Sequence, residues 1–440
     1  MRRVVLGLVA LAGCRQIFGV SVPEVVGDAS VDDATSPPDA AICETQSVEC
    51  ATPEILRTCT SAGATAVDTV CAWGCTEHAG PAHCGALVPR GGALKPTDTT
   101  DFTGLTDQNI QSATIDGSAG AITTGNGTIR GAGQGIQNGI DYEVRGGVAI
   151  FRMKSVLLDG PITFAGPYSI AIVVDGHLGA AGDFDVRGAC TDKTGGPGGF
   201  SGGMLRNAGG GAGGGGGASG GGGQAGGGGA GYGAVGGPGG TSTQVVEGGT
   251  TYGDVTITTL VGGSGGGAGN SMSATTSAHG GGGGGALQLV ANGDIAVTGT
   301  INAGGCGGAP GTAGPGGGGG GGAGGTLLLE APVVVLTGSI AVNGGGGGGG
   351  GGGGSAGGNG ALGLANALGG DSLQGHGGPG GAGDLPTGTA GQGNVQYGGG
   401  GGGGVGRIRL ETRTGAIGGL PTVSPPLTSA AATVATAVVD

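Results

Sequence analysis

The sequence is poor in charged and aromatic side chains, and each shortage excludes a class of function. Charged residues make up 10% of the 440-residue chain and aromatic residues 3%. Lys and Arg number 16 against 29 Asp and Glu, and a net charge of −13 argues against nucleic acid as a partner because phosphate contacts need clustered basic side chains. The shortage of aromatic rings argues against the stacking platforms with which polysaccharide-cleaving enzymes hold sugar rings.

Long apolar runs are also missing, and a short run lies at the N-terminus. Residues 4–12 are apolar and follow Arg2 and Arg3, but a membrane-spanning helix needs about 20 such residues. The run ends in Leu-Ala-Gly-Cys at residues 11–14, which resembles the cleavage site of bacterial lipoprotein signal peptides. This resemblance implies that residues 1–13 are removed and that Cys14 becomes the lipidated, palmitate-carrying first residue of an exported protein. The alternative is an uncleaved apolar N-terminus with a chance cysteine.

Residues 14–42 form the expected tether between the lipid and the folded parts. Residues 27–41 read GDASVDDATSPPDAA and lack any apolar period, so they cannot bury enough surface to offset their conformational entropy. We expect this segment to stay extended and to hold the folded parts away from the membrane. Arg15, which follows the lipid site in place of Asp, indicates the outer membrane by analogy with enteric bacteria.

The nine cysteines support export, because disulfides form and persist outside the cytoplasm. Residues 43–84 are too few to bury a self-sufficient core, so their six cysteines predict a three-disulfide module with fifteen possible pairings. The six are Cys43, Cys50, Cys59, Cys71, Cys75 and Cys84. A zinc site of Cys71, Cys75, His78 and His83 is the alternative, although its spacing is not that of a standard finger. Cys190 and Cys306 remain, and their pairing is expected on parity alone.

Repeated strand patterns follow the cysteine-rich module. Residues 285–291 (GALQLVA) match residues 325–331 (GTLLLEA) forty residues later, and a third copy begins at Gly406. Short runs of β-branched and aliphatic residues end at glycine turns, and helical periodicity is nearly absent outside the leader. We therefore predict an all-β fold over residues 101–420, a parallel β-solenoid with long glycine-rich insertions, followed by a flexible tail at 421–440. A β-sandwich with disordered insertions is the alternative.

Glycine supplies 125 residues, most densely in four predicted arms at residues 195–249, 262–285, 303–325 and 343–406. Ordering glycine costs more backbone entropy than ordering any other residue, so free arms are one expectation. Arms that emerge at a recurring point of the repeat would lie side by side, and glycine lets extended threefold backbones approach closely, so packed arms are the other. No strict G-X-Y triplet is present, which excludes collagen itself.

Catalytic motifs of useful specificity are missing, and the best candidates are two carboxylates. A period of two would place Asp183 and Asp185 on one face of a strand, with Arg187 on the same face. Paired carboxylates are typical of polysaccharide-cleaving enzymes. The favoured interpretation is a solvent-facing strand whose Asp and Arg side chains pair weakly. We predict no metal site and no cofactor.

The leader with its CRQIFG continuation, the acidic linker, the six-cysteine module and blocks such as LVGGSGGG (residues 260–267) together resemble the glycine-rich surface lipoproteins of myxobacteria-type predators. The likeness to PE-PGRS proteins rests on glycine content alone, because the PE domain is missing. The resemblance covers nearly the whole chain and implies location and form, not an activity.

These features predict a non-enzymatic, lipid-anchored protein of the cell envelope, structural or adhesive, that acts through a repetitive glycine-rich surface. Its partners would be the membrane, through the lipid, and polysaccharide or other matrix components; weak contacts at many points suit such a surface. One alternative is a carbohydrate-active enzyme, a polysaccharide lyase or hydrolase, on a β-helix. Another is an ordered glycine surface, such as one that binds ice.

Overall fold

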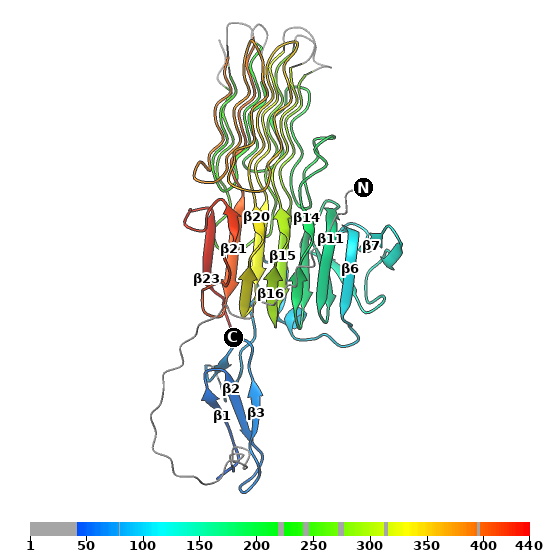
Figure 1. The fold of residues 1–440 in the computed structure, drawn as a ribbon, viewed down its shortest axis with the longest axis vertical. Coiled ribbons are helices and arrows are strands. Elements are labelled where there is room, and N and C mark those ends of the chain that lie inside the picture. The colour runs from blue at the N-terminus through cyan, green and yellow to red at the C-terminus, as the bar shows by residue number, and fades with distance from the viewer. Residues whose placement is uncertain are drawn as a thin grey trace, which may run out of the picture.

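The computed structural model describes residues 42–78, 80–218, 224–240, 246–271, 277–311, 316–393 and 397–440. Along its longest axis the molecule has three parts in a row (Figure 1). A small disulfide-bonded module lies at one end, two large β-sheets form the middle, and glycine-rich segments extend from the sheets to the other end. Within the described ranges, no helix has the length and apolar character needed to cross a membrane.

The N-terminal module consists of short antiparallel strands held by three disulfides. β1 (Ser47–Thr52) pairs with β2 (Ile55–Cys59), β2 with β3 (Val67–Val70), and β4 (Cys75–Thr76) with β5 (His83–Cys84). The disulfides are Cys43–Cys59, Cys50–Cys75 and Cys71–Cys84. All residues of β3 are exposed, so crosslinks and not a core hold these strands. Because Cys71 and Cys75 are both oxidised, the alternative zinc site is wrong.

The first large sheet has seven strands, of which six are parallel. In spatial order they are β23 (Ala432–Thr436), β21 (Arg407–Thr412), β18 (Thr326–Glu330), β15 (Ala286–Ala291), β12 (Ser169–Val174), β10 (Val148–Met153) and β9 (Asp141–Arg145). β9 runs antiparallel to β10 at one edge. Leu287 of β15 lies opposite Leu327 of β18, so the two copies of the sequence repeat are adjacent in the sheet.

The second large sheet has eleven strands, several of which are half-strands that share a long neighbour. The strands are β6 (Gln108–Asp116), β7 (Ala121–Thr124), β8 (Gly127–Arg130), β11 (Val156–Ala165), β13 (Leu178–Ala180), β14 (Asp183–Asp185), β16 (Asp294–Val297), β17 (Thr300–Asn302), β19 (Val333–Leu336), β20 (Ser339–Ala341) and β22 (Thr422–Ser424). β11 pairs with β13 and with β14. Between the half-strands, Gly182, Gly299 and Gly338 stack so closely that a Cβ on each would collide with the carbonyl oxygen of the glycine before it in the stack.

The two sheets face each other across one hydrophobic core. On the seven-stranded sheet, a buried row runs through Ile172, Leu289, Leu329 and Leu410. On the eleven-stranded sheet, the facing row is Phe184, Ile301, Ile340 and Val423. Each strand contributes alternate residues to this core, which is why the period-two pattern of the sequence indicated strands.

The predicted parallel β-solenoid is wrong. The strands form two separate sheets of mixed direction, in which β9–β10, β6–β7 and β7–β8 are antiparallel pairs, and no closed coil is found among the described residues. After β14, β17 and β20, the chain leaves the sheets and enters the glycine-rich end before it returns at β15, β18 and β21. The alternation of the sequence set which residues are buried, but it did not specify this return path.

The expected flexible tail at 421–440 is also wrong. Within this segment, β22 extends the eleven-stranded sheet beside β20, and β23 forms one edge of the seven-stranded sheet beside β21. Val439 then makes a bridge with Leu87 next to the N-terminal module. The C-terminal residues therefore form one edge of each large sheet.

The described parts of residues 195–285, 303–325 and 343–406 pack against one another into what we call the glycine bundle (Figure 1). Residues 316–325 illustrate the hydrogen-bond pattern of the bundle. Their backbone N–H groups donate in turn to three neighbouring segments, with N···O distances of 2.8–3.0 Å. The donor and acceptor pairs are 318→398, 321→401 and 324→404, then 319→309, 322→306 and 325→303, then 320→267 and 323→264. A direction that recurs every third residue is the mark of an extended threefold backbone.

The same segment accepts hydrogen bonds from three further segments, which gives it six neighbours. Its carbonyl groups at 318 and 321 accept from 227 and 230, those at 320 and 323 from 281 and 284, and those at 319 and 322 from 348 and 345. Of the two states that the sequence left open, packed or free arms, the structure has the packed one. Because N–H and C=O groups bond to neighbouring segments, the entropy lost on ordering glycine is offset by a full set of backbone hydrogen bonds.

Close approach is the reason for glycine in this bundle. A Cβ on Gly319 would collide with the carbonyl oxygen of His279, and one on Gly320 with that of Gly228. Neither glycine has a positive φ, so other residues could adopt the same backbone angles. Any larger side chain would force neighbouring segments apart.

Candidate functional site

The two candidate carboxylates lie on β14, on the outer face of the eleven-stranded sheet. Asp183 is exposed and accepts a hydrogen bond from Thr300 Oγ1 at 2.8 Å. Asp185 makes a two-point ion pair with Arg187, whose Nε and Nη2 atoms are each 2.9 Å from a carboxylate oxygen. This pairing raises the pKa of the Arg187 guanidinium. The structure therefore brings Asp183, Asp185 and Arg187 together on one face, as the sequence period indicated, and engages each carboxylate with a neighbour.

A hollow of about 600 Å³ lies beside Asp185, where the sheet meets the glycine bundle. Its floor comes from the end of β11, and its wall comes from residues 188–201. The wall is held in two places: the Cys190–Cys306 disulfide crosslinks it to the bundle, and Lys193 Nζ donates to the Gly307 carbonyl at 3.0 Å. Burial lowers the pKa of Lys193. The Cys190–Cys306 disulfide, which was expected because these two cysteines remained after the other six were paired, thus holds the wall of the hollow in place.

A second hollow of about 310 Å³ continues along the same face and shares Thr163 with the first. Its lining is rich in hydroxyl groups, from Ser112, Thr114, Thr123, Thr124 and Thr163. Strand register puts Thr123, Thr114, Thr163 and Asp185 in one row across four neighbouring strands. Sequence reasoning missed this row, and its only local signal was the alternation of hydroxyl residues in β6.

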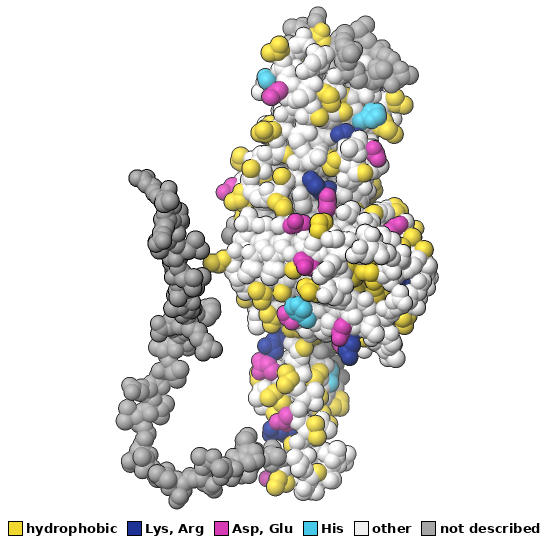
Figure 2. Space-filling view, turned by 45° about the vertical axis from the view of Figure 1, so that its right-hand side comes forward, with side chains coloured by type: hydrophobic (Ala, Val, Ile, Leu, Met, Phe, Trp, Pro, Cys, Tyr) yellow, Lys and Arg dark blue, Asp and Glu magenta, His cyan; other side chains and the backbone are white. Residues whose placement is uncertain are grey.

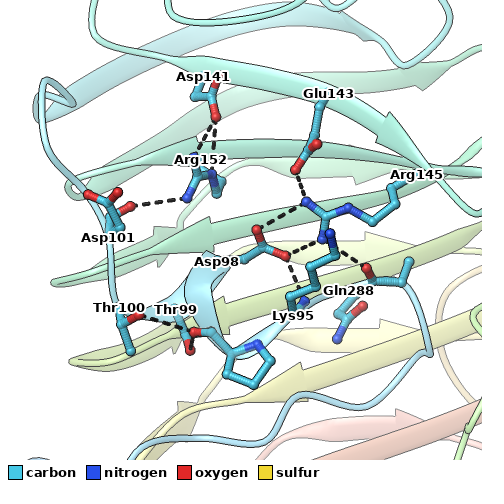
Figure 3. Close-up of polar contacts among 12 residues, drawn as sticks. Lys95, Asp98, Thr99, Thr100, Asp101, Asp141, Glu143, Arg145, Arg152 and Gln288 are labelled. Atoms are coloured by element: carbon cyan, nitrogen blue, oxygen red, sulfur yellow. Dashed lines mark hydrogen bonds and ion pairs between the residues drawn. The ribbon is translucent and has the colours of Figure 1, made fainter.

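A strap of residues 85–101 crosses the outer face of the seven-stranded sheet and connects the N-terminal module to it (Figure 3). Asp98 accepts from both terminal nitrogens of Arg145 at 2.6 and 3.2 Å. Burial pushes the pKa of Asp98 upward, but the Arg145 guanidinium and the Lys95 backbone N–H outweigh it and hold the pKa below its usual range. Arg152 pairs with Asp141 of the neighbouring strand at 2.7 Å and donates to the Asp101 carbonyl at 3.0 Å, so the strap is held to the sheet by the Arg145–Asp98 ion pair and by this hydrogen bond.

Two fully buried glutamates, Glu330 and Glu411, lie under the same strap. Glu330 accepts from the Arg90 backbone N–H at 2.9 Å and from Gln288 Nε2 at 2.6 Å. Arg409 Nη2 lies 2.8 Å from Glu411. Burial raises the pKa of Glu330 to about 7, and the negative charge of Glu411 adds to that shift. No motif in the sequence singled out this pair, because its partners lie far apart along the chain.

The remaining predicted site residues do not form a shared site. Cys14 lies outside the described residues. His177 lies 2.9 Å from Asp294 and His376 lies 3.7 Å from Asp371, while His83 Nδ1 contacts the Pro81 carbonyl at 2.9 Å. These three histidines contact three different partners and do not share a site.

Charge on the visible surface is scattered. Figure 2 shows acidic and basic side chains singly or in mixed pairs, with no extended patch of one sign. Comparisons of the chain with protein-family models, with curated proteins and with solved structures find no match.

Proposed function

We propose that this protein is a non-enzymatic, lipid-anchored component of the cell envelope that holds a rigid glycine bundle away from the membrane for adhesion or as part of a structural coat. The observation that carries the proposal is the linear order of the parts. The module that follows the tether lies at one end, and the glycine bundle lies at the opposite end (Figure 1). An anchor at Cys14 would therefore point the bundle outward.

Four disulfides indicate an oxidising compartment, which is consistent with export. Residues 14–41 number 28 and could span at most about 95 Å when fully extended, enough to carry the folded parts clear of a membrane surface. Lateral hydrogen bonding makes the bundle stiff, and a stiff projection keeps its surface available for many weak contacts at once.

The test begins with a cell that makes the full-length chain. Cys14→Ser should abolish labelling by palmitate and move the protein from the membrane to the soluble fraction. Surface proteolysis of intact cells should cut the wild-type protein, and cells displaying it should adhere to a matrix more than cells without it. Membrane retention of the Cys14→Ser protein, or equal adhesion of both cell types, would contradict the proposal.

A carbohydrate-active enzyme is less well supported, because Asp185 is tied to Arg187 and Asp183 to Thr300. Asp183→Asn and Asp185→Asn variants decide the matter: polysaccharide cleavage by the parent protein that both variants lack would favour the enzyme.

Recognition of an ordered surface such as ice is a second candidate, and the fixed lattice of the glycine bundle favours it over freely moving arms. Thermal hysteresis of the purified protein measures this property directly. Its absence at high protein concentration would remove the candidate.

A further inference from the structure

We infer that the two hollows on the outer face of the eleven-stranded sheet bind an extended, uncharged polysaccharide. This inference deepens the proposed adhesive function and rests on it, because only a displayed protein would meet such a polymer. The hollows share Thr163 and together cross β7, β6, β11 and β14. They adjoin at Thr163, so together they make a shallow depression that extends across four strands and suits a chain better than a compact ligand.

The lining of this depression matches a polyhydroxylated ligand. Thr123, Thr114 and Thr163 are exposed and stand in register on adjacent strands, which lie about 4.8 Å apart. Each hydroxyl group can both donate and accept a hydrogen bond, as each sugar hydroxyl can. A ligand with a regular series of hydroxyl groups can follow this row.

The Asp185–Arg187 pair supplies a fixed polar group at one end of the row. Asp185 Oδ1 accepts from the Arg187 backbone N–H at 3.0 Å as well as from its side chain, so the pair is held in place before any ligand arrives. Arg187 Nη1 makes no hydrogen bond to any described residue, and the side chain is 30% exposed. A planar donor beside a carboxylate acceptor can bind neighbouring hydroxyl groups at two points.

The wall of the larger hollow is rigid. The Cys190–Cys306 disulfide and the Lys193 to Gly307 hydrogen bond hold residues 188–201 against the bundle. A site that does not have to be ordered on binding loses less affinity to conformational entropy. With a rigid wall, a few hydrogen bonds are enough to give measurable affinity for a ligand.

Other classes of ligand fit less well. Asp183 and Asp185 are carboxylates on the same face, which disfavours an anionic polymer. Phe164 lines the larger hollow but is 2% exposed, so the residues that line the two hollows present no aromatic ring for an apolar peptide or for sugar stacking. Recognition must therefore come from hydrogen bonds, and an uncharged glycan is the partner rich enough in donors and acceptors.

The experiment uses the full chain carrying Cys14→Ser, purified in soluble form. Binding is measured by co-sedimentation with cellulose and chitin and by calorimetry with soluble β-glucan, α-glucan and the acidic polymer alginate. We expect binding to at least one uncharged polysaccharide and weaker binding to alginate. Thr163→Val removes one hydroxyl group from the shared position and should weaken that binding about threefold to tenfold, the value of one hydrogen bond. Arg187→Gln should weaken it by about tenfold or more, because a charge-assisted donor is lost.

Thr422→Val is the matched control, since Thr422 is exposed on the same sheet at β22, away from both hollows. All three variants should keep the thermal stability of the parent, which shows that the fold is intact. The inference is overturned if no uncharged polysaccharide binds, if alginate binds best, or if Thr163→Val and Arg187→Gln bind like Thr422→Val. If cells still adhere in that case, the proposed adhesive function stands and only the site is wrong; if they do not adhere, both fall.

Discussion

Glu330 and Glu411 lie directly opposite each other on the adjacent strands β18 and β21, and both side chains are fully buried. Glu411 has the guanidinium groups of Arg409 at 2.8 Å and Arg90 at 3.4 Å, whereas Glu330 accepts hydrogen bonds from Arg90 N–H and Gln288 Nε2 and is stabilised by the Arg90 charge only weakly. Two carboxylates directly opposite each other on adjacent strands repel when both are ionised, and this repulsion destabilises the folded state. The raised pKa of Glu330, about 7, follows from burial and from this neighbour.

Stability should therefore fall as pH rises through a defined window. The pKa of Glu330 is about 7 in the folded chain against 4.5 ordinarily, so between those values the folded state binds more protons than the unfolded state. The contribution of Glu330 to the unfolding free energy is therefore largest below pH 4.5, and it decreases as the pH rises to about 7. Glu330→Gln should remove that slope, so the stability of the variant relative to the parent should rise by more than about 1 kcal/mol between pH 5 and pH 8.

Urea unfolding of the parent and Glu330→Gln proteins at several pH values measures this effect. Glu411→Gln is the comparison variant: it should destabilise the protein, because it leaves the guanidinium groups of Arg409 and Arg90 without their carboxylate, and it should reduce the pH slope without removing it. Identical pH slopes in the parent and Glu330→Gln proteins would contradict the assignment.

One methyl group in the centre of the glycine bundle should be costly. Gly320→Ala would drive a Cβ into the Gly228 carbonyl and separate two segments, at a cost of about 2 kcal/mol or more in unfolding free energy. Gly125→Ala is the matched control because a Cβ there meets nothing within 4 Å and φ is not positive. Thermal unfolding should show a lower midpoint for Gly320→Ala alone; equal midpoints would mean that the bundle is loosely packed.

Arg130 stabilises the fold through the planar shape of its guanidinium group. Its guanidinium is fully buried and donates to five backbone carbonyl groups, those of residues 120, 131, 133, 135 and 140, and it lies 5.1 Å from the Tyr142 ring. Lysine has three donors and no planar fork, so Arg130→Lys should lower the unfolding free energy by about 2–3 kcal/mol. Arg57→Lys, at an exposed ion pair, should leave it nearly unchanged. The opposite ranking in urea unfolding would refute this role.

The Cys190–Cys306 disulfide should stabilise the junction between sheet and bundle. It closes a loop with a sequence separation of 116, and a crosslink over such a loop is worth about 4 kcal/mol. The double variant Cys190→Ser with Cys306→Ser should unfold at lower urea concentration. Cys50→Ser with Cys75→Ser should instead affect the N-terminal module and leave the unfolding of the sheets in place. If both double variants unfold alike, the crosslink does not support the junction.

Sequence alone gave part of this structure, and the reasons differ from element to element. The match of residues 285–291 with 325–331 correctly indicated that Leu287 and Leu327 segments would be neighbours, since like sequences pack on like. The solenoid was wrong because periodicity defines the buried face but not the path between strands. Arg407 and Arg409 alternate with apolar residues in the sequence, yet both are buried, because Arg407 donates to the Tyr252 carbonyl and Arg409 pairs with Glu411.

The candidate site was predictable to a similar extent. A period of two placed Asp183 and Asp185 on one face, and the structure agrees. The hollow beside them depends on a wall formed by residues 188–201 and on Thr163 from another strand. Those contacts come from tertiary packing, so no local pattern could reveal them.

Amide hydrogen exchange of residues 316–325 tests most directly whether the glycine segments form an ordered, laterally bonded bundle. Each of these amides that donates to a neighbouring segment should exchange as slowly as the amides of β15 and β18, because its opening requires several segments to separate. Exchange within seconds, at the rate of an unstructured glycine peptide, would show that the segments are free and that the rigid projection does not exist.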